Sequence, residues 1–241
     1  MCFFGVKNFM NSFNVNTGAL SLLSLATFLG AAPAQALVNS SFETGDFTNW
    51  ETIGNTTIQT SSFGSDPTEG DFQALLSTSQ PAAFDLSIEL FLGLPFGSLD
   101  GLGNGSSTTG SAIKQTFTAQ AGDTLTFDWN FLTNEATPEF NFNDFAFVSI
   151  AGVDTLANTF SEFVSSLTTF NEETEFKNFS FTFETSGTYT LGLGVTNSFD
   201  TFVSSGLLVD NAQLASVPEP ASILGVLAAL VTGSLFKRQQ N

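Results

Sequence analysis

The sequence predicts an all-β protein whose central part folds as an antiparallel β-sandwich. Three observations support this class. Several segments alternate apolar and polar residues with a period of two, which is typical of strands with one buried face. Short clusters of Gly, Ser, Thr and Asp separate these segments, as turns would. The segments amount to about eight strands, which is typical of a sandwich.

The clearest strand lies at residues 124–131, and residues 178–184 and 188–195 alternate in the same way. The residues on the apolar face of the first segment are Leu125, Phe127, Trp129 and Phe131. The other predicted strands are residues 56–60, 72–76, 114–118, 145–150 and 207–214. Two short turns, residues 121–123 and 185–187, are expected to close β-hairpins between the strands on either side of them.

The remaining part of the central region does not alternate. Residues 85–94 predict a short helix, and the Gly- and Ser-rich residues 97–110 predict an exposed loop. No internal repeat or linker divides residues 37–216, so a single domain is expected there.

The composition excludes several classes of chemistry. The 241 residues include no His, and the single Cys is Cys2. A Ser-His-Asp triad, a zinc–thiolate site and an internal disulfide are therefore excluded. The 5 basic residues against 23 acidic ones give a formal net charge of −18, which disfavours binding to nucleic acid. No pair of carboxylates is singled out by its spacing, so we do not expect an enzyme.

Phenylalanine is unusually frequent, with 29 Phe against 2 Trp and 1 Tyr. Many of these residues fall in the apolar phase of a predicted strand, and Phe buries a large area without a polar group to satisfy. We therefore expect Phe to build the core of a domain without disulfides. An exposed platform for sugar rings is the alternative.

The N-terminus predicts a secretory signal peptide over residues 1–36. Lys7 precedes an apolar run at residues 19–32, and small residues, Ala34 and Ala36, occupy the positions that signal peptidase recognises. Cleavage after Ala36 is expected, and an uncleaved membrane anchor is the alternative. The candidate start residues are Met1 and Met10.

The C-terminus predicts a transmembrane helix over residues 221–236, which are uncharged and precede Lys237 and Arg238. A helix needs about 20 residues to cross a bilayer, so the flanking residues must contribute to the span. The two cations predict a cytoplasmic C-terminus and an exported domain. A buried core helix is the alternative.

Residues 217–241 resemble the PEP-CTERM sorting signal of exported bacterial proteins. The motif residues are Val217, Pro218, Glu219, Pro220, Lys237 and Arg238. The resemblance implies recognition by an exosortase, a membrane protease or transpeptidase that cuts near Pro-Glu-Pro and moves the protein from the membrane to the cell surface or extracellular matrix. Proteins with this tail tend to occur in organisms that make exopolysaccharide.

The two ends of the central domain resemble the galactose-binding-like jelly roll, a fold of many carbohydrate-binding modules. Residues 38–50 contain N-x-x-F-E-x-G-x-F-x-x-W, and residues 208–214 contain V-D-N-A-x-L. In that family the glutamate after the opening Phe and an aspartate of the last strand often bind a structural calcium ion. The matching residues are Glu43 and Asp210, and carboxylate oxygens suit Ca²⁺. A surface carboxylate and a turn or cap residue are the alternative.

Two further polar groups stand out. Asn134-Glu135 and Asn143-Asp144 flank a predicted loop, and residues 172–175 form an acidic run. We expect solvated loops in both places. A second oxygen site or a ligand-binding rim is the alternative for the first group.

These observations predict an exported, surface-sorted, non-catalytic protein that binds or sits in exopolysaccharide. The expected partners are signal peptidase, exosortase, the membrane and a polysaccharide. A structural or adhesive envelope protein without affinity for sugars is the alternative.

Overall fold

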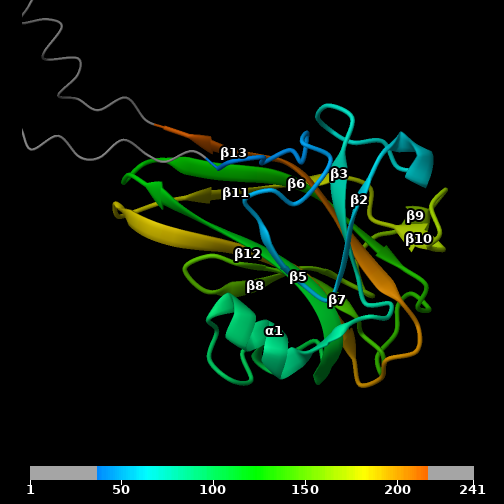
Figure 1. Cartoon of the computed structure of the whole chain (residues 1–241). Helices are drawn as coiled ribbons and strands as arrows, with labels where there is room; N and C mark the ends of the chain where they lie inside the picture. The colour runs from blue at the N-terminus through cyan, green and yellow to red at the C-terminus, as the bar shows by residue number, and fades with distance from the viewer. Residues whose placement is uncertain (1–36, 217–241) are drawn as a thin grey trace, which may run out of the picture. The chain divides into compact units, whose positions relative to one another are not determined.

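The computed structural model describes residues 37–216, which form a two-layer β-sandwich (Figure 1). The predicted signal peptide and the predicted helix at residues 221–236 lie outside the described residues. The predicted sites that also lie outside them are Ala34, Ala36, Val217, Pro218, Glu219, Pro220, Lys237 and Arg238. Within residues 37–216, no helix has the length and apolar character needed to cross a membrane.

The first sheet contains six strands, and all of its pairs are antiparallel. Its strands are β1 (Glu51–Ile53), β4 (Ala83–Phe84), β5 (Ser107–Ala119), β7 (Phe145–Ser149), β8 (Val153–Asn158) and β12 (Gly187–Ser198). The order is β1-β5-β12-β7-β8, and β4 also pairs with β5. The long central pair of β5 and β12 therefore forms the middle of this layer.

The second sheet contains seven strands, again all antiparallel. Its strands are β2 (Asn55–Gln59), β3 (Gln73–Ser77), β6 (Thr124–Thr133), β9 (Val164–Ser165), β10 (Glu172–Glu173), β11 (Lys177–Thr182) and β13 (Ser205–Ala215). The order is β2-β3-β13-β6-β10-β9, and β11 also pairs with β6. The predicted antiparallel sandwich is confirmed.

The core lies between the two sheets. The apolar face predicted for β6 is buried, and it belongs to the same cluster as Leu191, Leu193 and Val195 of β12. Phe42 of the first described segment also joins this cluster, with its ring centroid 5.4 Å from that of Trp50. Phe supplies most of the largest fully buried side chains, so Phe builds the core as expected.

Three short helices accompany the sheets. They are η1 (Ser61–Phe63), α1 (Asp85–Leu92) and η2 (Asp100–Leu102). The predicted helix is confirmed as α1, which ends at Gly93 in the left-handed conformation that favours glycine. Ile88 and Leu92 pack against Phe145 and Phe147 of β7 on the outer face of the first sheet. This cover explains why every residue of β7 is buried on both faces.

The structure corrects both predicted hairpins. Residues 121–123 connect β5 to β6, and residues 185–187 connect β11 to β12, but the strands of each pair lie in different sheets. The two connections instead contact each other, because Gly122 N donates to Phe183 O at 2.7 Å and Phe183 N donates to Asp123 O at 2.9 Å. A turn sequence sets the local bend, and the bend here carries the chain from one layer to the other.

Two predicted loops are also partly strand. In the segment at residues 97–110, Ser107–Gly110 belong to β5, and Ser107, Thr109 and Gly110 are buried against β12 and β4. In the acidic run at residues 172–175, Glu172 and Glu173 form β10 and are half-buried. Hydrogen bonds to neighbouring strands and loops satisfy the polar groups of these residues, which allows them to be buried. The polar composition of the two segments therefore did not indicate that they are partly buried.

Candidate functional site

Asp210 is buried in β13 and holds the segment that precedes β3. Its Oδ2 accepts from Thr68 N at 2.7 Å, from Thr68 Oγ1 at 3.1 Å and from Glu69 N at 2.9 Å. Its Oδ1 accepts from Asn211 N at 2.7 Å. Burial raises the pKa of Asp210, and the N–H donors act in the opposite direction by stabilising the charged form.

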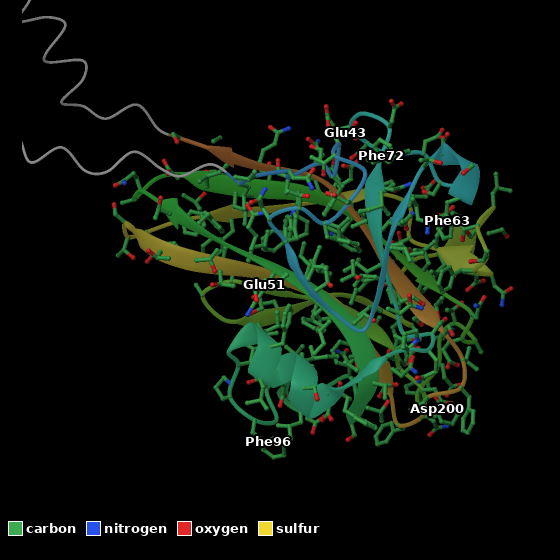
Figure 2. All side chains as sticks on the ribbon, viewed as in Figure 1. Glu43, Glu51, Phe63, Phe72, Phe96 and Asp200 are labelled. Carbon is green, nitrogen blue, oxygen red and sulfur yellow. The ribbon has the colours of Figure 1, made fainter. Side chains whose placement is uncertain are left out.

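Glu43 is exposed and holds the other end of the same segment. Its Oε1 accepts from Asp71 N and Phe72 N, both at 3.0 Å, and its Oε2 accepts from Asp71 N at 3.1 Å. Figure 2 shows Glu43 next to Phe72. Gly70 has a φ of +65°, and a Cβ there would lie 2.2 Å from Glu43 Cδ, so the close approach requires glycine.

The two predicted calcium ligands therefore bind one segment, residues 68–72, from its two ends. Each oxygen of both carboxylates accepts at least one backbone N–H, so both side chains are engaged in holding this segment. Among residues 37–216, no group of three or more His, Cys, Asp and Glu side chains could hold a metal ion. Calcium at this pair stays a prediction.

A pocket of about 300 Å³ lies where β6 ends and β10 pairs with it. We call it the Phe160 pocket. Its lining comes from the β6–β7 connection, the β8–β9 connection and β10, and includes Thr137, Pro138, Thr159, Phe160, Ser161 and Glu172. Thr137 Oγ1 donates to Glu172 Oε2 within this lining. Hydroxyls and a carboxylate thus converge on a small concave surface.

An exposed pair of phenylalanine rings, Phe160 and Phe140, lies at this pocket through Phe160, and Phe163 also lines it. Phe160 lines it and is 44% exposed, and Phe140 is 79% exposed. The two rings pack edge to face, with centroids 4.7 Å apart and planes at 73°. An exposed aromatic pair beside convergent polar groups is the arrangement that can hold a ring-shaped polar ligand by its apolar face.

Hydrogen bonds fix the loops that carry these rings. Asn143 Oδ1 accepts from Thr159 N at 3.0 Å, and Thr159 Oγ1 lies 2.9 Å from the carbonyl oxygen of Glu139. Asn158 Nδ2 donates to Asn104 Oδ1 at 2.7 Å. The β6–β7 and β8–β9 connections are therefore tied together, and the pocket is formed before any ligand arrives.

Two buried carboxyls lie behind this end of the sandwich. Asp144 Oδ1 accepts from Ser198 N at 2.9 Å, and its Oδ2 accepts from Ser205 Oγ at 2.7 Å. Burial raises the pKa of Asp144 to about 8, and the charges of Glu135 and Asp200 add to the effect. Burial also raises the pKa of Glu135 to about 7, with Asp200 again contributing. Asp200 is labelled in Figure 2.

The expectation of a solvated loop at Asn134-Glu135 and Asn143-Asp144 is therefore wrong. Glu135, Asn143 and Asp144 are buried, and Asn134 Oδ1 accepts from Asn171 N at 2.9 Å. Asn134, Asn143 and Asp144 support the connections near the Phe160 pocket, because their side chains accept hydrogen bonds from backbone N–H groups of other segments. Polarity alone did not distinguish this supporting role from exposure to solvent.

The sequence did not single out Thr137, Phe140 or Phe160 as site residues. They lie in connections without periodicity, where neither a strand pattern nor a motif marks them. The available signal was a pair of Phe residues, at positions 140 and 142, that had no place in a predicted strand.

No family model matches the chain, and no curated protein matches it. Among solved structures, TmCBM61 in complex with β-1,4-galactotriose aligns with 76% of this chain and 99% of its own, at 12% identity and a TM-score of 0.44. The mannan-recognising carbohydrate-binding module TmCBM27 aligns with 77% of this chain and 97% of its own, at 16% identity and a TM-score of 0.38.

A tailspike protein of bacteriophage CBA120 aligns with 76% of this chain and 21% of its own, at 12% identity and a TM-score of 0.39. At these identities and TM-scores the likenesses carry no argument about function. The strand pairing within this chain shows the antiparallel sandwich.

Proposed function

We propose that this chain is an exported, surface-sorted, non-catalytic protein that binds neutral polysaccharide of an exopolysaccharide matrix through the Phe160 pocket. One observation carries the binding proposal: the exposed Phe140–Phe160 pair stands beside hydroxyl and carboxylate groups that converge on one pocket. A jelly-roll-like module in which loops at one end of the sandwich hold a sugar accounts for this arrangement.

The chemistry of the pocket favours a sugar ring. A sugar presents C–H groups on its faces, which can lie on Phe160, and hydroxyls on its edges, which can bond to Thr137, Ser161 and Glu172. The volume of about 300 Å³ stands at the lower end of the usual range for ligand pockets, so it suits a short stretch of glycan. No Lys or Arg lines it, and the net charge of −18 disfavours acidic polysaccharides.

Export and sorting complete the proposal. Signal peptidase removes residues 1–36 after Ala36, and the helix at residues 221–236 holds the protein in the membrane. An exosortase then acts at Val217-Pro218-Glu219-Pro220 and transfers the protein to the cell surface or extracellular matrix. The arrangement of apolar runs, small residues and cations in the sequence supports these steps.

Binding is tested by native affinity electrophoresis of the full chain in gels with mannan, galactan or alginate. We expect retardation by at least one neutral polysaccharide and none by alginate, which is acidic. Phe160→Ala should weaken the binding about tenfold, since an aromatic contact contributes up to about 1.5 kcal/mol. Phe202→Ala is the matched control, because Phe202 is 88% exposed and lies outside the lining of the pocket. Equal retardation of wild type and Phe160→Ala would contradict the site.

An adhesive envelope protein without affinity for sugars is the second candidate. Phe84, Leu90 and Phe96 are largely exposed on and beside α1, which gives the outer side of the first sheet an apolar surface for contact with other macromolecules. A glycan array that stays silent with the full chain, followed by loss of surface adhesion in Leu90→Lys, would favour this candidate.

A further inference from the structure

A second pocket lies at the β11–β12 connection. Its volume is about 260 Å³, and we call it the Tyr189 pocket. Its lining comes from the end of β11, the β11–β12 connection, the start of β12 and the β7–β8 connection, and includes Phe181, Thr182, Phe183, Glu184, Thr185 and Tyr189. The binding proposed above at the Phe160 pocket does not involve these residues.

The aromatic side chains of the Tyr189 pocket form a fixed frame. The ring centroids of Phe183 and Tyr189 are 4.4 Å apart, and those of Phe181 and Phe183 are 5.1 Å apart with planes at 76°. The Tyr189 hydroxyl donates to Thr185 O at 2.7 Å, which holds the ring in place. The pocket therefore has rigid aromatic walls and a hydroxyl at its edge.

The two pockets share their chemistry. Each is lined by Phe rings, by Thr hydroxyls and by one glutamate, and neither lining contains Lys or Arg. Their volumes of about 300 and 260 Å³ are similar. A neutral ligand with an apolar face and several hydroxyls, such as a sugar ring, satisfies the groups in both.

The pockets lie at opposite ends of β6. Thr182 of the Tyr189 pocket pairs with Thr124, the first residue of β6, and Glu172 of the Phe160 pocket pairs with Thr133, the last. A strand rises about 3.3 Å per residue, so the two pockets are separated by roughly 30 Å. In Figure 1 the β11–β12 connection and β10 stand at opposite sides of the domain.

We infer that the Tyr189 pocket is a second glycan-binding site, so that one domain binds two segments of neutral polysaccharide and cross-links separate chains. This inference rests on the proposed function of the Phe160 pocket. Two sites at opposite ends of β6 can engage two different polysaccharide chains, which makes the protein a linker within a matrix.

Isothermal titration of the full chain in detergent tests the second site, with mannohexaose and the corresponding β-1,4-galactan hexasaccharide as probes. We expect two ligands per wild-type chain for one of these probes. Phe181→Ala and Phe160→Ala should each weaken one of the two sites about tenfold, so that only one ligand per chain binds with the wild-type affinity. Phe179→Ala is the matched control for Phe181→Ala, because both residues lie on β11 but Phe179 lies outside the lining of the pocket.

A second variant protects the test against misfolding. Thr185→Trp places a large ring at an exposed position of the Tyr189 pocket without removing a core side chain, and it should reduce the stoichiometry to one. Cross-linking is measured by light scattering with long mannan or galactan. Wild type should aggregate the polysaccharide, and each single-pocket variant should bind it without aggregation.

Three outcomes would overturn the inference. One ligand per wild-type chain, weakened by Phe160→Ala and unaffected by Phe181→Ala and Thr185→Trp, would refute the second site and leave the proposed function intact. Two ligands without aggregation of the long polysaccharide would refute cross-linking. No binding of either probe by wild type would contradict the proposed function and this inference together.

Discussion

At the scale of single residues, carboxylates serve as anchors for the backbone. Asp210 and Glu43 hold residues 68–72 from the two ends through hydrogen bonds to backbone N–H groups. This segment leads into β3, and Asp210 belongs to β13, the partner of β3. The anchors therefore connect the start of the domain, the entry to β3 and the last strand.

Removing an anchor is expected to destabilise the domain. Asp210→Asn should lower the free energy of unfolding by about 1–3 kcal/mol, since buried N–H donors lose their charged acceptor. Urea denaturation of the full chain measures this change. The calcium prediction adds a second expectation, that EDTA lowers the Tm of wild type and leaves that of Asp210→Asn unchanged.

Asp66→Asn is the control for this experiment, because Asp66 is exposed in the neighbouring loop. If EDTA leaves the wild-type Tm unchanged, calcium at Glu43 and Asp210 is refuted, and loop anchoring is their role. If Asp210→Asn unfolds at the same urea concentration as wild type, the anchoring role is refuted.

At the scale of elements, Asp144 joins the two sheets at the end that carries the Phe160 pocket. It directly precedes β7 of the first sheet, and its carboxyl contacts Ser198 at the end of β12 and Ser205 at the start of β13. β13 belongs to the second sheet, so one buried side chain connects both layers. A buried carboxyl that spans layers makes the packing of these strands sensitive to its protonation.

Stability is expected to fall as the pH rises from 5 to 8.5. The pKa of Asp144 is about 8 in the folded protein, above its ordinary value of 3.8, so the folded state holds a proton that the unfolded chain has lost. This contribution is fully present below about pH 4 and is lost as the pH rises through the folded pKa. Glu135, whose pKa is about 7, acts in the same direction.

Thermal unfolding across this pH range measures the effect. The wild-type Tm should fall by several degrees between pH 5 and pH 8.5, and Asp144→Asn should flatten the slope because asparagine stays neutral. Asp154→Asn on β8 removes the same formal charge from an exposed position and should keep the slope. A wild-type Tm that rises across this range would contradict the prediction.

At the scale of the whole molecule, the Phe160 pocket and the last residue of β13 lie at opposite ends of β6. Ala215, the last residue of β13, pairs with Thr124 at the first end of β6, whereas Glu172 of the Phe160 pocket pairs with Thr133 at the other end. The Phe160 pocket is therefore remote from the residue that leads into the predicted sorting signal.

Sorting through Pro-Glu-Pro is expected to decide where the protein resides. In a host that expresses an exosortase, replacing Pro218, Glu219 and Pro220 by Ala should keep the protein in the membrane fraction, whereas wild type reaches the cell surface or medium. Fractionation and immunoblotting measure the distribution. Ser216→Ala, directly before the motif, is the control. Release of the triple variant to the extent of wild type would contradict recognition of this motif.

The sequence by itself determined which residues face the core and where the largest elements lie. In β6 and β12 the alternation of residues places the apolar side chains inside, because a half-buried strand has a period of two. The lack of this alternation at residues 85–94 also predicted a short helix, which is α1. The sequence also excluded chemistry that needs His or an internal disulfide, since the chain has no His and Cys2 is its single Cys.

The tertiary structure alone decided which strands pair and which polar residues converge. Alternation shows that one face of a strand is buried, but the pattern is the same for a strand of either sheet. The sequence therefore did not show that the connections at residues 121–123 and 185–187 cross between the layers. Likewise, Thr137, Phe160 and Glu172 come from three separate connections and strands. Their convergence depends on long-range hydrogen bonds, which have no period along the chain.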